Sequence, residues 1–184
     1  MFYGQHTKIL DDKDRVIVPA EFRQALAKVS PGDGKTDGKG DGKKVGDFFI
    51  TITPGRDRCL SLFPVEQFTK LFLNFKPHES YADPDVQDYT RLVVGRSHRV
   101  ACDKQGRVHL PRHLIDDAGL EKELVFVGLF DHAEIWDVVR WGQFNAEKRP
   151  TITAVAQKVH DPRRAERSGN RDSADDDAGS DRDG

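Results

Sequence analysis

The stretch DDKDRVIVP, Asp11 to Pro19, returns later in the chain as DKQGRVHLP, Asp103 to Pro111. Each copy begins with Asp, turns through three polar residues, and continues with Arg and an alternating apolar strand that stops at Pro. A protein of 184 residues that makes the same polar turn twice contains a duplicated unit. This duplication predicts the organisation of the fold.

The two halves match at two different offsets. An offset of 92 residues superimposes the turns and also pairs His6 with His98, whereas an offset of 73 pairs Leu62 with Ile135. The first half therefore carries 19 extra residues, the difference between these offsets. We place them in the glycine-rich segment 31–47, PGDGKTDGKGDGKKVGD, which predicts a flexible surface loop.

Each half predicts the same order of elements: strand, turn, strand, short helix, strand, strand. The short helices are AEFRQALAKV and RHLIDDAG, the latter closed by Gly119, and the later strands are FFITITP with CLSLF and ELVFVGLF with AEIW. Two helices are expected between the halves, one opened by Pro64 and one capped by Asp83. A further helix, VVRWGQFNAEK, follows the second half.

Composition limits the class of protein. The hydrophobic content of 36% suffices for one compact unit, and the net charge of −2 neither demands nor excludes a polyanionic partner. The last 24 residues hold eight acidic residues and five arginines without a large apolar side chain, so they predict a disordered tail. Cys59 and Cys102 are too few for a disulfide framework, and no signal peptide or membrane span is recognisable, which favours a cytoplasmic protein.

The repeated turn admits two interpretations. A carboxylate four residues before a guanidinium can staple a hairpin, although an exposed pair contributes only about 0–1 kcal/mol. Alternatively, the carboxylate orients the Arg so that its remaining donors, with a neighbouring Lys, meet a nucleic-acid groove. The candidate DNA-binding residues are Lys13, Arg15, Lys104 and Arg107, and the candidate turn-orienting residues are Asp11 and Asp103.

Local charge differs between the two copies. Residues 91–112 contain six basic side chains and one acidic side chain, whereas residues 8–23 contain four of each. On this linear count, the second turn is expected to attract a polyanion more strongly than the first.

Longer motifs give a specific resemblance. They are the opening MFYGQHTKILDDKDRVIVPAEFR, the C-L-x-L-[aromatic]-P of Cys59 to Pro64, and the V-G-x-x-D-H-x-E-I-W-D of Val127 to Asp137. Over about residues 1–145 the chain resembles the MraZ family of bacterial transcription regulators, built from two AbrB-like (SpoVT/AbrB) modules. The resemblance implies an α+β fold in which two tandem swapped-hairpin modules form a pseudo-dimeric β-barrel with peripheral helices.

The implied domain organisation has five parts. The predicted segments are an AbrB-like module at 5–67 containing the loop 31–47, a helical connector at 68–94, a second AbrB-like module at 95–138, a C-terminal helical segment at 139–160 and a disordered acidic tail at 161–184.

The resemblance also implies a function. It suggests a sequence-specific DNA-binding regulator, associated with the nucleoid, that assembles into rings and binds direct repeats in its own promoter, among genes for cell division and wall synthesis. The family's DNA-contacting turn maps to Lys13 and Arg15, supported by Asp11. Two departures weaken phosphate binding there: Asp14 stands where the family usually has Gly, and Tyr3 where a basic residue is common.

The sequence leaves two other classes of function to consider. Zinc or acid–base chemistry could use His109, His113 and Cys102, but Pro111 separates the histidines and no companion metal motif is present. An AbrB-like antitoxin that binds a protein partner would need a partner-binding tail, and the acidic C-terminus offers little apolar surface for one. We therefore expect double-stranded DNA and further copies of the chain as partners, with no enzymatic activity, cofactor, metal, membrane or small-molecule substrate.

Overall fold

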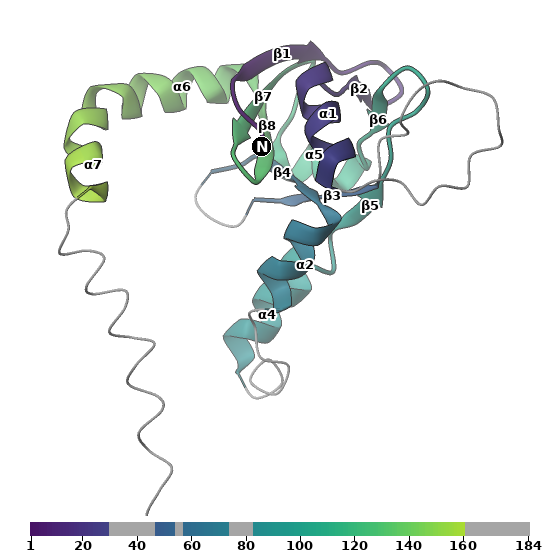
Figure 1. The fold of residues 1–184 in the computed structure, drawn as a ribbon, viewed down its shortest axis with the longest axis horizontal. Coiled ribbons are helices and arrows are strands. Elements are labelled where there is room, and N and C mark those ends of the chain that lie inside the picture. Colours follow the sequence, from purple (N-terminus) through teal and green to yellow (C-terminus); the bar gives the residue numbers. More distant parts are fainter. Residues whose placement is uncertain (30–46, 54–56, 74–82, 161–184) are drawn as a thin grey trace, which may run out of the picture. The chain divides into compact units, whose positions relative to one another are not determined.

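The computed structural model describes residues 1–29, 47–53, 57–73 and 83–160 (Figure 1). The predicted tail at 161–184, and the predicted loop at 31–47 apart from Asp47, lie outside the described residues. The elements are β1 (Gln5–Ile9), β2 (Arg15–Ile17), α1 (Ala20–Val29), β3 (Phe48–Ile52), β4 (Leu60–Pro64), α2 (Val65–Leu73), α4 (Pro84–Val93), β5 (His98–Val100), β6 (Arg107–His109), α5 (Arg112–Ala118), β7 (Glu123–Leu129), β8 (His132–Asp137), α6 (Val138–Lys148), η1 (Arg149–Thr151) and α7 (Ile152–Val159).

The chain divides into two compact units, Met1–Trp141 and Gly142–Gly184. The first unit contains all eight described strands, and therefore both predicted repeats. The described part of the second unit is helical, and the apolar residues Ile152, Val155 and Val159 of its helix α7 are exposed. None of the described helices is long and apolar enough to span a membrane.

Local sequence signals explain most element boundaries. In β2, Val16 is fully buried and Ile17 is exposed, as the alternating pattern predicts. Helix α5 ends at Gly119, whose φ of 57° is the left-handed conformation that suits glycine. Helix α4 begins after Asp83, whose Oδ1 accepts a hydrogen bond of 2.9 Å from the N–H of Asp85.

The strands form two antiparallel sheets. The larger sheet has the order β1-β7-β8-β4-β3-β5, and β2 pairs with β6 in a two-stranded sheet. This order is symmetric about the central pair β8–β4, because β1, β7 and β8 of one side correspond to β5, β3 and β4 of the other. The first strand of each half pairs with a later strand of the opposite half, so the two halves exchange strands.

The two-stranded sheet has the same symmetry. When the halves are exchanged by the offset of 92 residues, its residue pairs map onto themselves, and the pair Val16–Val108 lies on the approximate two-fold axis. Both valines are fully buried, so the axis passes through the core. The paired residues are Arg15 with His109, Val16 with Val108 and Ile17 with Arg107.

The strand register locates the extra residues of the first half. In the first half, Ile50 of β3 pairs with Leu62 of β4, and at the equivalent place in the second half Phe126 of β7 pairs with Ile135 of β8. The offset is 73 between Leu62 and Ile135 but 76 between Ile50 and Phe126. Three of the extra residues therefore lie in the connection between β3 and β4, and sixteen precede β3. This corrects the expectation that the segment 31–47 contains the entire excess.

The prediction of a β-barrel is wrong. Among the described residues, β1 and β5 are the two edges of the six-stranded sheet, and no hydrogen-bonded ladder joins them. After β1 the chain turns into β2. Here an isolated β-bridge joins Leu10, the residue after β1, to Val16 of β2. Because β2 and β6 pair with each other in a separate sheet, the part of the chain that the structure describes is a mixed α+β fold with antiparallel sheets and no closed barrel.

Aromatic side chains fix helices to the larger sheet. Phe22 of α1 meets Phe2 edge-on, with ring centroids 5.5 Å apart, and meets Phe126 of β7 at 6.2 Å. Phe68 of α2 stacks on Phe49 of β3 at 4.2 Å. Figure 1 shows α1 crossing beside β1 and β2, so this helix supports the strand that leads into the first turn.

Replacement of Phe22 by Ala should lower the free energy of unfolding by about 3–5 kcal/mol, because it removes a side chain that is only 1% exposed and leaves a cavity. Urea denaturation measures this change. The matched control is Leu92→Ala on α4, where an exposed side chain should cost less than about 0.5 kcal/mol. Equal losses for the two variants would contradict the assignment of Phe22 to the core.

Candidate nucleic-acid interface

The first turn is closed by Asp11. Its Oδ1 accepts hydrogen bonds of 2.9 Å from the backbone N–H groups of Lys13 and Arg15. Its Oδ2 accepts from Nε of Arg15 at 2.9 Å and lies 2.7 Å from Nη2 of the same guanidinium. The carboxylate thus fixes both the turn and the orientation of the arginine.

The second turn repeats this geometry. Oδ1 of Asp103 accepts from the backbone N–H groups of Gln105 at 2.8 Å and Arg107 at 2.9 Å. Its Oδ2 binds Nε and Nη2 of Arg107, each at 2.8 Å. The same four contacts at equivalent positions make the two turns structural equivalents.

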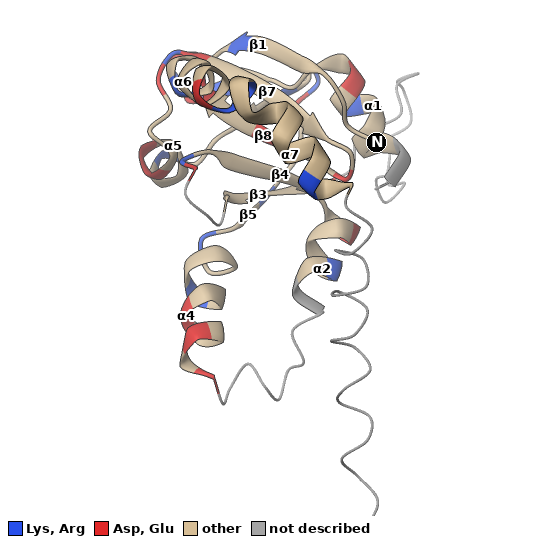
Figure 2. Ribbon diagram, turned by 90° about the vertical axis from the view of Figure 1, so that its left-hand side faces the viewer, with Lys and Arg blue, Asp and Glu red and all other residues tan. Residues whose placement is uncertain are grey.

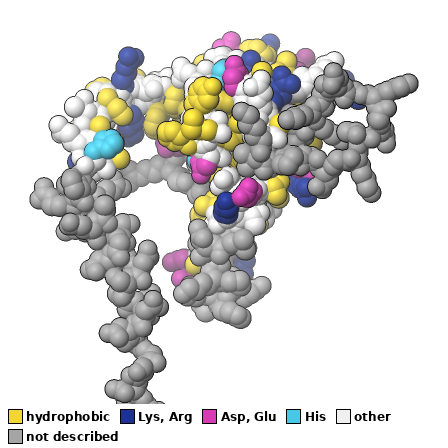
Figure 3. Space-filling model, in the orientation of Figure 1, with side chains coloured by type: hydrophobic (Ala, Val, Ile, Leu, Met, Phe, Trp, Pro, Cys, Tyr) yellow, Lys and Arg dark blue, Asp and Glu magenta, His cyan; other side chains and the backbone are white. Residues whose placement is uncertain are grey.

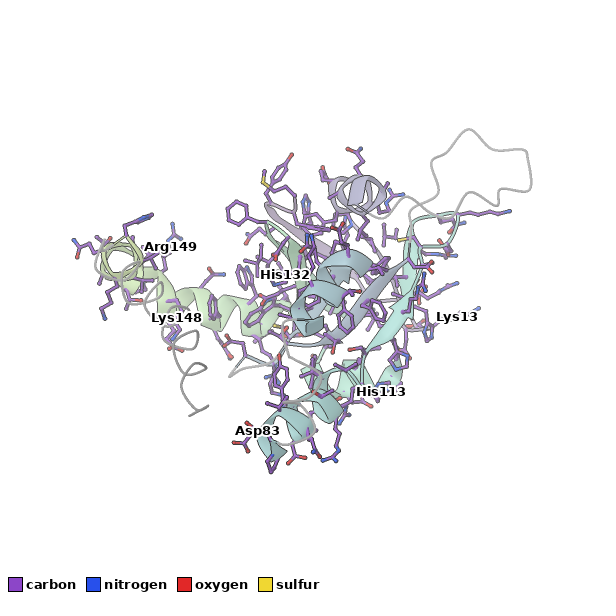
Figure 4. The ribbon with its side chains drawn as sticks, turned by 60° about the horizontal axis from the view of Figure 1, so that its bottom comes forward. Lys13, Asp83, His113, His132, Lys148 and Arg149 are labelled. Atoms are coloured by element: carbon purple, nitrogen blue, oxygen red, sulfur yellow. The ribbon has the colours of Figure 1, made fainter. Side chains whose placement is uncertain are left out.

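In each turn the Asp engages two of the three guanidinium nitrogens, Nε and Nη2. A guanidinium has five N–H donors, so Nη1 and the second hydrogen of Nη2 remain for an acceptor outside this pair. Arg15 and Arg107 are half-buried, whereas Lys13 and Lys104 are exposed. Figure 4 places Lys13 at the rim of the fold, directed away from its body.

The ion pairs shift the pKa of both aspartates downward. The hydrogen bond from the Arg15 side chain is the largest cause that lowers the pKa of Asp11 from 3.8 to about 2. The backbone N–H of Arg107 is the main cause that lowers the pKa of Asp103, and the Arg107 side chain adds to it. Reciprocally, the hydrogen bond to Asp11 raises the pKa of Arg15. Both aspartates are therefore ionised at neutral pH.

The residue before each Arg adopts a left-handed backbone. The φ angle is 54° for Asp14 and 75° for Gly106, as the turn chemistry predicts. The carboxylate of Asp14 also has a partner that sequence reasoning missed: Nη1 of Arg112 lies 3.4 Å from its Oδ1. Arg112 begins α5 and therefore comes from the opposite half of the chain.

The second turn has its own neighbour from the opposite half. The guanidinium of Arg23, on α1, lies so close to Gly106 that a Cβ added there would be 2.5 Å from Nη1. Because Gly106 also has a positive φ, both space and backbone conformation favour glycine at this position. No sequence signal indicated that Arg23 lies beneath this turn.

The linear charge count for residues 91–112 omits acids that pair in space with the basic residues of this segment. Besides Arg107, which pairs with Asp103 inside the turn, three of the six basic residues pair with acids outside the segment: Arg91 with Asp88 at 2.8 Å, Arg96 with Asp117 at 2.5 Å and Arg99 with Asp47 at 2.9 Å. Arg112 pairs with Asp14 of the first turn and with Asp116. Figure 2 shows basic segments interspersed with acidic ones along the described chain, rather than gathered in one band. These pairs reduce the net charge around residues 91–112 but leave the charges of the turn itself unchanged, so the stronger attraction of the second turn stays a prediction.

The histidines and cysteines do not form a reactive cluster within the described chain. The ring of His113 lies 4.9 Å from that of His98, between centroids. Among the described residues, no group of three or more His, Cys, Asp or Glu side chains could hold a metal ion. Burial raises the pKa of Cys59 to about 12 and that of Cys102 to about 11, so both thiols are protonated at neutral pH.

These features define a class of protein: a duplicated α+β fold whose two halves exchange strands and present equivalent Asp–Arg turns. Comparisons with known proteins agree with this class. Residues 94–161 match the family model described as “MraZ protein, putative antitoxin-like”. Proteins named “Transcriptional regulator MraZ” are similar over most of the chain.

The relative from Salinispora arenicola is 35% identical over 161 residues, covering 86% of this chain and 97% of the relative. Those from Salinispora tropica and Acetivibrio thermocellus are 34% and 30% identical, covering 86% of this chain and 97% and 96% of their own lengths. The chain belongs to the MraZ family. This family is one of DNA-binding transcriptional regulators, which confirms the prediction of a protein that is not an enzyme.

Replacement of Arg15 by Ala should raise the pKa of Asp11 from about 2 towards 3.8, because the largest cause of the shift is removed. The pKa of Asp11 is lower in the folded chain than in the unfolded chain. Its ionised carboxylate therefore stabilises the fold fully above pH 3.8, and this stabilisation is lost as the pH falls through about 2. Carbon-detected NMR of the Asp11 carboxyl, followed over a pH titration of the unsubstituted chain and of Arg15→Ala, measures this shift. Arg91→Ala, which alters an ion pair on α4, should leave Asp11 unchanged, and a midpoint near 3.8 in the unsubstituted chain would contradict the paired geometry.

Proposed function

We propose that this chain is a sequence-specific DNA-binding transcriptional regulator that acts on direct repeats in its own promoter, within a cluster of genes for division and cell-wall synthesis. Such a protein would work in the cytoplasm, on the nucleoid. The observation that carries the proposal is the pair of equivalent turns, in each of which one carboxylate oxygen holds Nε and Nη2 of the arginine and leaves guanidinium donors for an outside acceptor.

The finer architecture we propose is two tandem AbrB-like modules, at 5–67 and 95–138, with helical segments at 68–94 and 139–160. Two observations support it. The order of the six-stranded sheet is symmetric between the halves, and the β2–β6 pairs map onto themselves when the halves are exchanged. A single chain would thereby contain the exchange of hairpins that a dimer of single modules makes between two chains.

The DNA-binding residues we propose are Lys13 and Arg15 in the first turn and Lys104 and Arg107 in the second. Asp11 and Asp103 would orient the two arginines. A guanidinium that is already held at Nε and Nη2 loses little further side-chain freedom when it binds, which favours a rigid contact to a phosphate or a guanine edge. The lysines are exposed and would add phosphate contacts of lower geometric specificity.

Few basic residues per subunit impose a multivalent mechanism. Phosphate contacts supply much of the affinity for DNA, and each contact is weakened by salt. A ring of subunits that presents several such turns would gain affinity through effective concentration when it meets repeats about one helical turn, or roughly 10 base pairs, apart. We therefore propose a homo-oligomer as the DNA-binding form.

An exposed apolar patch supports self-association. Figure 3 shows hydrophobic side chains gathered near the N-terminus, over β7 and β8. Phe130 is 74% exposed and has a φ of 64°, a conformation that is costly for a bulky residue and suggests a function for its side chain. Backbone hydrogen bonds of 2.8 and 2.9 Å join Phe130 to Phe2. The exposed residues of this patch are Met1, Tyr3, Leu129 and Phe130.

Replacement of Arg15 or Arg107 by Ala should each weaken binding to a duplex from the chain's own promoter by at least about tenfold at fixed salt, because each removes an oriented contact from every subunit. Fluorescence anisotropy with the full chain measures the affinity. Arg91→Ala is the matched control, since Arg91 is an exposed arginine that pairs with Asp88 on α4. Unchanged affinity in both turn variants, with all chains folded, would refute the proposed site.

Replacement of Phe130 by Asn should shift the chain towards smaller assemblies, because Asn tolerates a positive φ but removes the aromatic side chain from the patch. Size-exclusion chromatography with light scattering measures the mass at several protein concentrations. Leu92→Asn on α4 changes an exposed apolar residue elsewhere and should leave the mass unaltered. An unchanged mass for the Phe130 variant would exclude this patch as a subunit contact.

A second candidate is an antitoxin-type module that binds a protein partner, because the matching family model carries the words “antitoxin-like” in its description. The two functions differ in what they bind. A defined footprint on repeated promoter DNA would favour the regulator, whereas copurification with a small basic protein, without such a footprint, would favour the antitoxin.

A further inference from the structure

The first turn contains an unfavourable charge for a DNA-binding element. Residues 11–15 carry three acidic and two basic side chains, a net charge of −1, whereas residues 103–107 carry one acidic and two basic side chains, a net charge of +1. Asp11 is already paired with Arg15, and Asp14 stands where the second turn has Gly106. The carboxylate of Asp14 would therefore repel the phosphate that Lys13 and Arg15 are proposed to bind.

Arg112 lies where it compensates this charge. Its Nη1 is 3.4 Å from Oδ1 of Asp14, and its Nε is 3.2 Å from Oδ1 of Asp116, one turn further along α5. Asp116 thus holds one edge of the guanidinium and leaves the opposite amino group for Asp14. The side chain of Arg112 is 70% exposed and that of Asp14 is 26% exposed, so the pair lies at the surface.

The backbone fixes this approach between the two halves. Leu110 lies two residues before Arg112, and its N–H donates a 2.8 Å hydrogen bond to the carbonyl of Asp14. The equivalent bond, from Val18 to Gly106, is 3.0 Å long. The start of α5 is therefore anchored beside the first turn by the same pairing that joins β2 to β6. Because Gly106 brings no charge, the second turn requires no such compensation.

We propose that Arg112 is a positioning residue of the first DNA-binding turn, contributed by the second half, which neutralises Asp14 so that Lys13 and Arg15 can approach a phosphate. This inference rests on the function proposed above. Long and exposed, the ion pair adds little to folding stability. Its effect is on the local potential that the DNA meets, which falls off over about 8–10 Å in physiological salt.

A double-mutant cycle tests the inference. The full chain, Arg112→Ala, Asp14→Asn and the double variant are titrated with a duplex from the chain's own promoter, by anisotropy at fixed salt. Asn keeps the tolerance for a positive φ and removes the charge. Arg112→Ala alone should weaken binding about three- to tenfold, whereas in the Asp14→Asn background the same change should alter binding less than about twofold.

A salt series separates compensation from direct contact. If Arg112 only neutralises Asp14, Arg112→Ala should leave the slope of log affinity against log salt unchanged. If Arg112 binds a phosphate itself, Arg112→Ala should weaken binding equally in both backgrounds, and the magnitude of the slope should decrease by about one. This result would overturn the inference. No loss in either background would overturn it as well. Arg99→Ala, which alters an exposed ion pair with Asp47, should leave affinity unchanged.

Arg15→Ala in the same assay distinguishes the two levels of failure. If Arg15→Ala retains full affinity, the proposed DNA-binding turn itself is wrong. If Arg15→Ala weakens binding but the cycle is additive, the DNA-binding turn stands and only the role of Arg112 is rejected. Thermal denaturation of every variant, with midpoints within a few degrees of the unsubstituted chain, ensures that the comparison is between folded proteins.

Discussion

The antiparallel pairing of β2 with β6 is the constraint on which the rest of the structure depends. These strands lie 92 positions apart in sequence, yet each supplies the partner that the other needs, and the buried pair Val16–Val108 lies on the approximate two-fold axis between them. Each strand follows a turn that begins with Asp. The pairing therefore places the two turns at equivalent positions in the fold and joins the two halves of the duplicated sequence through the core.

The same pairing makes each turn a composite of both halves. The first turn receives Arg112 from α5, and the second receives Arg23 from α1. Within each turn, the carboxylate of Asp11 or Asp103 holds the arginine at two nitrogens, and this contact keeps the pKa of the acid low. The orientation of each arginine is thus fixed by the Asp of its own turn, whereas a further guanidinium beside the turn comes from the opposite half. The chain belongs to the MraZ family of transcriptional regulators, and this arrangement is compatible with the proposed DNA-binding form, in which many weak contacts act together.

The sequence predicted what depends on local patterns. The order of strands and helices, the buried face of β2, the cap at Asp83 and the left-handed Gly119 all follow from periodicity and turn chemistry. The candidate turns could be found because a duplication repeats them. The open sheet, the three extra residues between β3 and β4, and the positions of Arg112 and Arg23 beside the turns could not be found, because they depend on which strands pair across the halves. A linear charge count could not reveal the ion pairs with distant acids for the same reason.

Hydrogen–deuterium exchange of the full chain, with and without a duplex from its own promoter, tests the central claim most directly. Binding through the two turns should slow exchange of the backbone N–H groups within 11–15 and 103–107, while the buried strands β4 and β8 change little. Slowed exchange confined to α2 and α4, with both turns unaffected by saturating DNA, would contradict the claim that oriented arginines at the turns form the DNA-binding surface.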